Sequence, residues 1–395
     1  MTGLNLCNYL DRYLLPALVT PIERDLRLTD TQFSLVLTAF MIGYFATAPI
    51  VGYWGDRLPR RGLIVAGVVA WCLGTLLTAW AHGLVSLICF RVLIGFGEAS
   101  YGTLGPSWIA AAYPESQRNN AISLFYIAIP VGSALGFVLG GFMAALWGWR
   151  AAFLVAGVPA LVLAALVMLQ REPKRMARGK DAGGVVPALW EYLRLARIRP
   201  YRLVVLGYVA QTFALGGFGA WAAAFLERAH HMATRDADRF FGLALVVSGL
   251  VATLGGGAIG TWWQRRSRAG YASLLAVSAV LAVPFGFAAF LVASAALSKL
   301  CLVAAMLLLF TSTGPLNTLI LETAPAALRA SAMAASIFAI HLFGDLWSPL
   351  LVGWISDRAG SLRLAILVSL PPAIVICAVF WLVLARVMAV ESRAS

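Results

Sequence analysis

Residues 52–61 read GYWGDRLPRR and lie at the junction of two apolar stretches, residues 32–54 and 62–81. About 20 apolar residues cross a hydrocarbon core of about 30 Å as a helix. Each flanking stretch is long enough to do so, and the junction is too short and too basic to belong to either. The segment therefore predicts a tight turn between two membrane helices.

The same alternation of apolar stretch and short polar turn continues along the chain. Of its 395 residues, 61% are hydrophobic and 12% are charged, whereas soluble domains carry about 25% charged residues. This composition argues against a soluble enzyme, and the uninterrupted apolar blocks argue against a β-barrel, whose strands alternate. We expect an all-α membrane protein with twelve spans, at residues 2–20, 32–54, 62–81, 84–112, 119–145, 150–170, 201–226, 239–261, 270–293, 297–321, 328–355 and 361–389.

The net charge of +13 is distributed unevenly between the two sets of loops. Counting charges at span ends with the adjacent loop, the loops after even-numbered spans and the C-terminus hold 19 Arg and Lys against 7 Asp and Glu; the opposite loops hold 9 against 7. Because basic loops stay in the cytoplasm, we expect both termini there, in a cell inner membrane. The charge is thus mainly a topology signal, with anionic lipids as secondary partners and no nucleic acid.

The spans divide six and six around the longest connection. We expect an N-terminal lobe at residues 1–170, a cytoplasmic linker at 171–200 and a C-terminal lobe at 201–395. Apolar residues at helical spacing in 185–198 favour an interfacial amphipathic helix, with a plain solvated linker as the alternative. The basic turn recurs without its acid at 257–266, so the halves resemble each other, as in a two-lobed transporter.

The turn at residues 52–61 resembles the cytoplasmic signature of the major facilitator superfamily, G-x-x-x-D-R-x-x-R-R. In that superfamily the signature latches the two lobes in one conformation; a basic turn that only sets topology is the alternative. The matching residues are Gly52, Asp56, Arg57, Arg60 and Arg61.

Glycines recur every four residues in the fifth span, at Gly132, Gly136 and Gly140. They form a smooth helix face against which another helix can pack closely, and they resemble the superfamily's glycine-rich fifth helix. We expect a packing role for them.

A few charged residues lie inside the spans, where each costs about 2.5 to 3.5 kcal/mol at the centre on insertion scales. Arg91 and Glu98 are seven residues apart, so they share a face roughly 10 Å apart along the axis. His341 and Asp345 are four apart and also share a face. The intramembrane charges are Asp11, Arg12, Arg91, Glu98 and Asp345.

Three of these residues are acids and only two are arginines. Burial raises the pKa of a carboxyl group and a nearby arginine lowers it, so an acid that gains and loses an arginine would take up and release a proton. Our hypothesis makes Asp11 this switch and Glu98 a second proton site. Arg91 would be their shared partner and the anchor for an anionic substrate; a static buried ion pair is the alternative.

Several motifs together resemble Spinster-type transporters of the major facilitator superfamily. The match is dense over residues 5–160 and 322–360 and thin over the linker and the seventh to ninth spans. The motifs are Asn8-Tyr9-x-Asp11-Arg12, Gly97-Glu98-Ala99-Ser100-Tyr101 followed by Pro106, Phe125-Tyr126-x-Ala128-Ile129-Pro130-Val131-Gly132-Ser133, and His341-x-x-Gly344-Asp345-x-x-Ser348-Pro349 with Gly353 and Asp357.

The resemblance implies a secondary transporter that works by alternating access. Animal members are implicated in export of sphingosine-1-phosphate and of lysophospholipids, and proton-linked transport has been proposed for them. It implies a polar cluster of Asp11, Arg91 and Glu98 in the cavity, and a partner cluster of His341 and Asp345 in the other lobe.

We therefore expect an amphipathic lipid-like substrate, with protons as coupling ion. Arg12 and Tyr126 are further candidate contacts, as ion-pair anchor and cavity wall. A multidrug or small organic anion exporter of the same superfamily is the alternative. A lipid-modifying enzyme would need a nucleophile and base held together or a set of metal ligands, and the sequence shows neither. A channel is the third possibility. No nucleotide-binding loop is present, and we expect no cofactor, no metal and a monomer.

Overall fold

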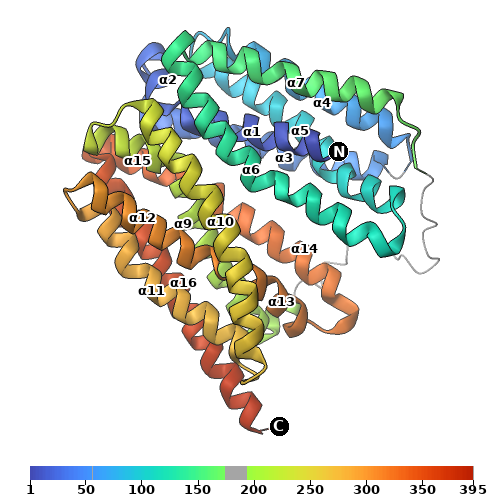
Figure 1. Cartoon of the computed structure of the whole chain (residues 1–395), viewed down its shortest axis with the longest axis vertical. Coiled ribbons are helices and arrows are strands. Elements are labelled where there is room, and N and C mark those ends of the chain that lie inside the picture. Colours follow the sequence, from blue (N-terminus) through green and yellow to red (C-terminus); the bar gives the residue numbers. More distant parts are fainter. Residues whose placement is uncertain (56, 174–193, 395) are drawn as a thin grey trace. The chain divides into compact units, whose positions relative to one another are not determined.

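The computed structural model describes residues 1–55, 57–173 and 194–394, which are almost entirely helical (Figure 1). These residues form two compact units. The first comprises Met1–Val185 and Met232–Leu243, and the second comprises Val186–His231 and Ala244–Ser395. The unit boundary at Leu243 falls inside one continuous helix, so that helix contributes to both units.

The described part of the first unit contains seven helices and the beginning of an eighth. They are α1 (Thr2–Ala17), α2 (Val19–Leu26), α3 (Asp30–Gly55), α4 (Arg60–Thr78), α5 (Leu84–Ala112), α6 (Glu115–Trp147), α7 (Trp149–Leu169) and the start of α10 (Thr234–Gln264).

The second unit contains the rest of α10 and helices that are more often interrupted. They are α9 (Arg199–His230), α11 (Gly270–Leu291), α12 (Ala295–Phe310), α13 (Thr313–Thr323), a short 3₁₀ helix (Ala326–Leu328), α14 (Arg329–Ile340), a π-helical turn (His341–Asp345), α15 (Ser348–Ala359) and α16 (Leu362–Ala394). Two predicted spans are therefore broken: 297–321 divides near Ser312, and 328–355 divides at the π-helical turn.

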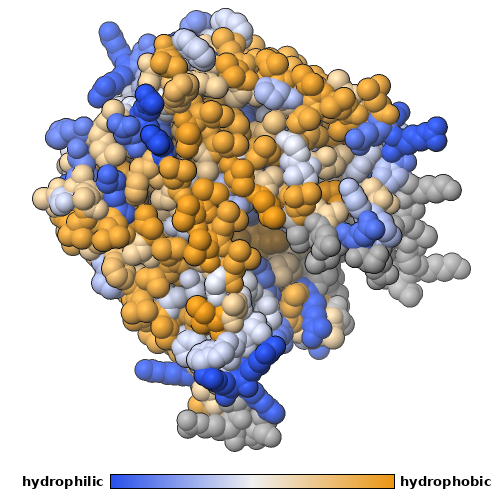
Figure 2. Space-filling model, viewed as in Figure 1, coloured by the Kyte–Doolittle hydropathy of each residue, from blue (hydrophilic) through white to orange (hydrophobic). Residues whose placement is uncertain are grey.

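Eleven segments of the described chain are long and apolar enough to cross a membrane, judged by length and composition. The first predicted span, residues 2–20, differs from the others. The chain leaves the helical conformation at Leu18, two residues after Pro16, so α1 has 16 residues and α2 follows it. Hydrophobic side chains cover much of the face shown in Figure 2, as expected of a surface that meets lipid.

Close packing of α1 on α6 depends on the glycines of the fifth span. A methyl group at Gly132 would lie 2.6 Å from the carbonyl oxygen of Leu6, and one at Gly136 would lie 2.5 Å from that of Leu10. At Gly140 it would lie 3.0 Å from the Leu14 side chain. The whole glycine stripe thus faces α1.

Glycines also bring α5 against its two neighbours. A methyl group at Gly95 would overlap the carbonyl oxygen of Phe40 on α3, and one at Gly97 would overlap that of Gly67 on α4. Two helices can approach this closely only where side chains are absent. The glycines of α5 therefore hold α3 and α4 close to the segment that carries Arg91 and Glu98.

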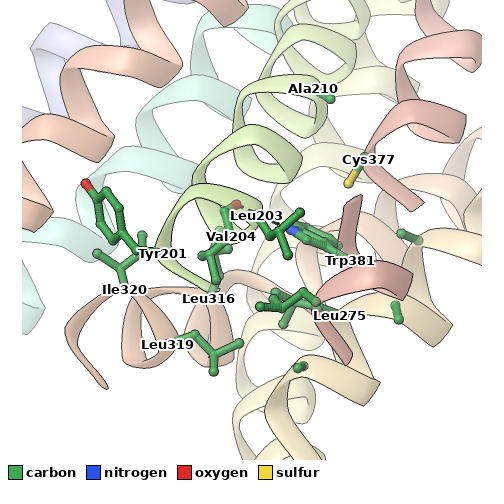
Figure 3. Packing of buried hydrophobic residues seen from close by; sticks show 14 of the residues in the cluster. Tyr201, Leu203, Val204, Ala210, Leu275, Leu316, Leu319, Ile320, Cys377 and Trp381 are labelled. Atoms are coloured by element: carbon green, nitrogen blue, oxygen red, sulfur yellow. Dashed lines mark hydrogen bonds between the residues drawn. The ribbon is translucent and has the colours of Figure 1, made fainter. Parts of the chain in front are cut away.

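The core of the second unit centres on Trp381 of α16 (Figure 3). Its indole lies against Gly207 of α9, where any side chain would overlap it, and its Nε1 donates to the carbonyl oxygen of Val204 at 3.4 Å. Nearby, the hydroxyl of Tyr201 donates to the carbonyl oxygen of Ala332 at 2.8 Å. These contacts join α9 to α14 and α16.

In the first unit, Asp25 lies outside the predicted spans and connects α2 to the start of α7. Its carboxylate pairs with Arg150 and accepts a hydrogen bond from Trp149 Nε1 at 3.1 Å. The hydrogen bond from Arg150 lowers the pKa of Asp25. The folded-state pKa of Asp25 is therefore below its unfolded value. The pair stabilises the fold fully when the pH is above the pKa of an unfolded aspartate, and this stabilisation is lost as the pH falls through the lowered pKa.

The α1–α6 contact can be tested at its glycines. Gly136→Ala places a methyl group against backbone and is expected to lower the free energy of unfolding by about 1 to 3 kcal/mol, the usual cost of overpacking. The measurement is thermal unfolding in detergent. Gly62→Ala is the control, because a methyl group there meets no atom within 4 Å; equal destabilisation by both variants would contradict the assignment.

Candidate functional site

Charged side chains of two helices, α1 and α5, meet in the interior of the first unit. Asp11 on α1 and Arg91 and Glu98 on α5 are each only 1% exposed. Each is an electrostatic neighbour of the other two. The fold thus brings together three of the residues that the sequence predicts for a polar cluster.

Asp11 is held by α4. Its Oδ2 accepts hydrogen bonds from Trp71 Nε1 at 2.7 Å and from Thr75 Oγ1 at 2.5 Å. The second carboxylate oxygen, Oδ1, is buried and has no hydrogen-bond partner among the described residues. The carboxyl group is therefore fixed in place with one oxygen left for a proton, a water molecule or a moving cation.

The direct ion pair of the site joins Arg12 to Glu98. Arg12 Nη2 and Nε donate to Glu98 Oε2 at 2.8 and 3.2 Å, and the Glu98 side chain is fully buried while that of Arg12 is 24% exposed. The guanidinium carbon also lies 4.7 Å from the ring centre of Phe40 and 5.0 Å from that of Tyr9. Such cation–π contacts stabilise a charge that water does not reach well.

Arg91 is the buried cation without a hydrogen-bonded acid. Its Nε and Nη1 have no hydrogen-bond partner in the described part of the chain, and its guanidinium carbon lies 5.2 Å from the Phe40 ring centre. The hypothesis named Arg91 as partner of both acids, but Arg12 makes the pair with Glu98. Asp11 and Arg12 are consecutive and about 100° apart around α1, so one reaches α4 and the other α5.

The second unit contains the other predicted cluster. His341 Nδ1 lies 3.0 Å from Asp345 Oδ2 within the π-helical turn. A methyl group at Gly216 would lie 2.7 Å from Asp345 Cβ, and one at Gly344 3.1 Å from the carbonyl oxygen of Val209. Both glycines let the turn press against α9. π-helical turns are frequent at functional sites.

Tyr126 lies on α6 in the first unit. Its ring packs edge-on against the buried Phe125 at 5.3 Å between centroids, and the residue is 49% exposed. It is therefore available to a ligand, although no described polar contact ties it to the charged cluster.

The predicted latch residues contact helix ends of the first unit. Arg60 Nη1 donates to the Ser107 carbonyl oxygen on α5 at 3.5 Å, and Arg61 Nη1 donates to the Gln170 carbonyl oxygen after α7 at 3.2 Å. The guanidinium carbon of Arg57 lies 3.5 Å from the ring centre of Tyr53. Gly52 lies in α3 with only the Thr103 side chain near its Cβ direction. Asp56 lies outside the described residues, as does most of the predicted 185–198 helix.

Glu172 is a contact that sequence reasoning missed. Its carboxylate accepts from the backbone N–H of Arg60 at 2.9 Å and of Arg61 at 3.3 Å. A carboxylate at this position satisfies free N–H groups and complements the dipole of α4. The link joins the linker to the signature turn across more than a hundred residues, so no local pattern indicated it.

Other missed residues carried a readable signal. Trp71 and Thr75 are polar groups four apart in an apolar span, and this spacing places them on one face. Asp238 was counted with an outward loop, but it is fully buried in the first turns of α10. A methyl group at Gly141 of α6 would lie 2.6 Å from its Oδ2.

Among the described residues no group of three or more His, Cys, Asp and Glu could hold a metal ion.

Comparison with known proteins agrees with this architecture. The profile of the Major Facilitator Superfamily matches residues 1–344. Two solved structures share the fold: a bacterial homologue of the human lysosomal transporter Spinster in an inward-facing, unoccupied conformation, and a D-xylose-proton symporter. The first has a TM-score of 0.83 at 22% identity and covers 99% of this chain and 95% of that one. The second has a TM-score of 0.75 at 19% identity and covers 98% of this chain and 95% of that one.

The chain is therefore a multi-pass transporter of the major facilitator superfamily. Human protein spinster homolog 1 is 33% identical over 384 residues, covering 90% of this chain and 71% of the relative. The sphingosine-1-phosphate transporter SPNS2 of Danio rerio is 29% identical over 374 residues, covering 89% and 74%. Within the superfamily, this chain belongs to the Spinster family, which confirms the predicted resemblance, and like its relatives it works by alternating access.

The Arg12–Glu98 pair can be tested by removing one partner or both. Arg12→Met leaves a buried carboxylate without its cation and is expected to cost about 3 to 5 kcal/mol of unfolding free energy, whereas removing both charges is often neutral. Arg12→Met with Glu98→Leu should therefore recover most of the stability. Thermal unfolding in detergent measures both.

Arg57→Met is the matched control, because Arg57 is an exposed arginine of the same unit. It should leave stability nearly unchanged. A double variant no more stable than Arg12→Met would show that the pair is not the reason for the loss.

Proposed function

We propose that the protein carries an amphipathic lipid-like anion, of the lysophospholipid or sphingoid phosphate type, with protons as the coupling ion. The observation that carries this proposal is a buried arginine, Arg91, beside Asp11, whose Oδ1 has no partner among the described residues. The substrate class is supported by the relatives named as sphingosine-1-phosphate transporters.

The charges of the site connect proton binding to anion binding. With all four groups ionised, Asp11, Arg12, Arg91 and Glu98 sum to zero. A proton on Asp11 leaves a net charge of +1, carried by a guanidinium with unused N–H donors. In a site of low dielectric such a charge attracts an anion strongly, so we propose that protonation of Asp11 prepares Arg91 for a phosphate head group.

Few ionisable groups of the described chain interact electrostatically with Asp11. They are Arg12 and Cys7 on its own helix, Cys72 on α4, and Arg91 and Glu98 on α5. Each acid keeps one buried oxygen without a partner among the described residues, Asp11 Oδ1 and Glu98 Oε1. Glu98 pairs directly with the Arg12 cation, whereas Asp11 accepts only from the uncharged donors Trp71 and Thr75. We propose Asp11 as the coupling acid and Glu98 as the second proton site, with His341 and Asp345 as the partner cluster in the C-terminal lobe.

The lobes at residues 1–170 and 201–395 are proposed to rock about the linker at 171–200. Gly52, Asp56, Arg57, Arg60 and Arg61 are proposed to latch them. Glu172 extends this latch, because it connects the start of the linker to the first turn of α4. From the positive-inside asymmetry we propose an inner-membrane monomer with cytoplasmic termini, in contact with anionic lipids.

A multidrug or small organic anion exporter is the alternative function. A cavity with one cationic anchor and aromatic neighbours such as Tyr126 suits many amphiphiles, and the two functions differ in the head group that they require.

The substrate class is tested by binding competition in proteoliposomes. Lysophospholipids and sphingoid phosphates should compete with one another, whereas cationic drugs of equal chain length should not. Arg91→Gln should weaken binding of the phosphate-bearing amphiphiles by about tenfold, the loss of one charge-assisted hydrogen bond. Equal competition by cationic drugs would favour the exporter.

Proton coupling is tested with Asp11→Asn, which mimics the protonated acid. In the wild type, substrate binding should tighten as the pH falls, by about tenfold for a coupling of ordinary strength. Asp11→Asn should bind at high pH and lose this dependence, while substrate exchange without net proton movement continues. Asp25→Asn, an exposed aspartate of the same unit, is the control, and an unchanged pH profile in Asp11→Asn would exclude Asp11 as the coupling acid.

A further inference from the structure

Apart from the charged cluster, the first unit contains an apolar cavity of about 80 Å³. It lies where α1, α6 and α7 meet, three helices that contact one another. From α1 it is lined by Cys7, Leu10 and Leu14, which are three or four residues apart and share one face. No charged side chain lines it.

The cavity results from small side chains on α7. Ala152, Ala156 and Pro159 line it, and their side chains are short. On another face of α7, Gly157 packs against α4, where a methyl group would lie 2.7 Å from Leu76. That contact holds α7 in place, so the helix cannot move inward to close the gap.

The cavity is continuous with the surface that meets lipid. Val155 lines it and is also 43% exposed. Val158, on the same helix, is 51% exposed and does not line the cavity. In a membrane-spanning unit the medium beside these valines is hydrocarbon. Apolar cavities exclude water and accept apolar ligands, so the occupant supplied by this medium is an alkyl chain.

We propose that this cavity binds a short segment of one acyl chain of a bilayer phospholipid, inserted from the side between α1, α6 and α7. The site is separate from the charged cluster because it offers no polar group to a head group. Cys7 and Leu10 flank Asp11 on α1, so an inserted chain supports the helix that carries the coupling acid. The occupant is the bilayer lipid and not the transported amphiphile.

The test uses proteoliposomes that contain a phosphatidylcholine with a diazirine in the middle of one acyl chain. After irradiation, mass spectrometry maps the adducts. The informative residue of α1 is Leu14, because it lines the cavity and is only 1% exposed, so lipid at the surface does not reach it. Adducts are expected there and on the outer face of α7.

Ala156→Phe fills the cavity and should reduce the α1 adducts about tenfold, while those on the outer face of α7 remain as an internal reference. Val158→Phe, on the same helix but outside the cavity, should leave the α1 adducts unchanged. Ala156→Leu, a smaller change, should give an intermediate loss and guards against misfolding of the Phe variant; thermal unfolding checks all three.

The absence of α1 adducts in the wild type, or adducts undiminished in both Ala156 variants, would overturn the proposal. Displacement of the adducts by a lysophospholipid at transport concentrations would also overturn it, because the cavity would then belong to the substrate. That result would leave the proposed transport function standing, which the proton and competition assays test separately.

Discussion

The stability of the first unit depends on the partners of its buried charged side chains. Glu98 is fully buried and lies 2.8 Å from Arg12, and Asp11 is held by two donors of α4. An unpaired charge in this environment costs several kcal/mol, so these partners stabilise the ionised form of each acid. Arg91, whose Nε and Nη1 have no partner in the described chain, is the exception, and a buried cation of this kind is where a transporter can exchange one partner for another.

Glycine makes this arrangement possible. The helices that carry the charged residues pack closely at positions without side chains, α1 against α6 and α5 against α3 and α4. Small side chains also leave the cavity beside α7, which alanines and a proline of α7 line together with residues of α1. Close helix contacts, a buried polar cluster and an apolar lateral cavity are thus consequences of one packing pattern in a single unit.

Much of the fold could be predicted from the sequence, because apolar length and turn composition locate membrane helices directly. The prediction was weaker where the backbone departs from a regular helix. The break after α1 follows Pro16, and the division of α12 from α13 lies beside Gly314-Pro315, but apolar length alone does not register either signal. The π-helical turn at His341 has no strong local signal. In the site, the residues were predictable because charge is rare in spans. Their pairing was not, since the partner of Glu98 depends on the rotation of α1 and the contact of Glu172 depends on distant chain segments.

We propose that Asp11 changes its protonation state when an anionic amphiphile binds. Infrared difference spectroscopy on proteoliposomes can measure this directly, through the carbonyl stretch of a protonated carboxylic acid on addition of a lysophospholipid or sphingoid phosphate. We expect a gain of that band in the wild type and in Asp25→Asn, and its loss in Asp11→Asn. A band of the same size in Asp11→Asn, or none in the wild type, would show that Asp11 is not the group that takes up the proton.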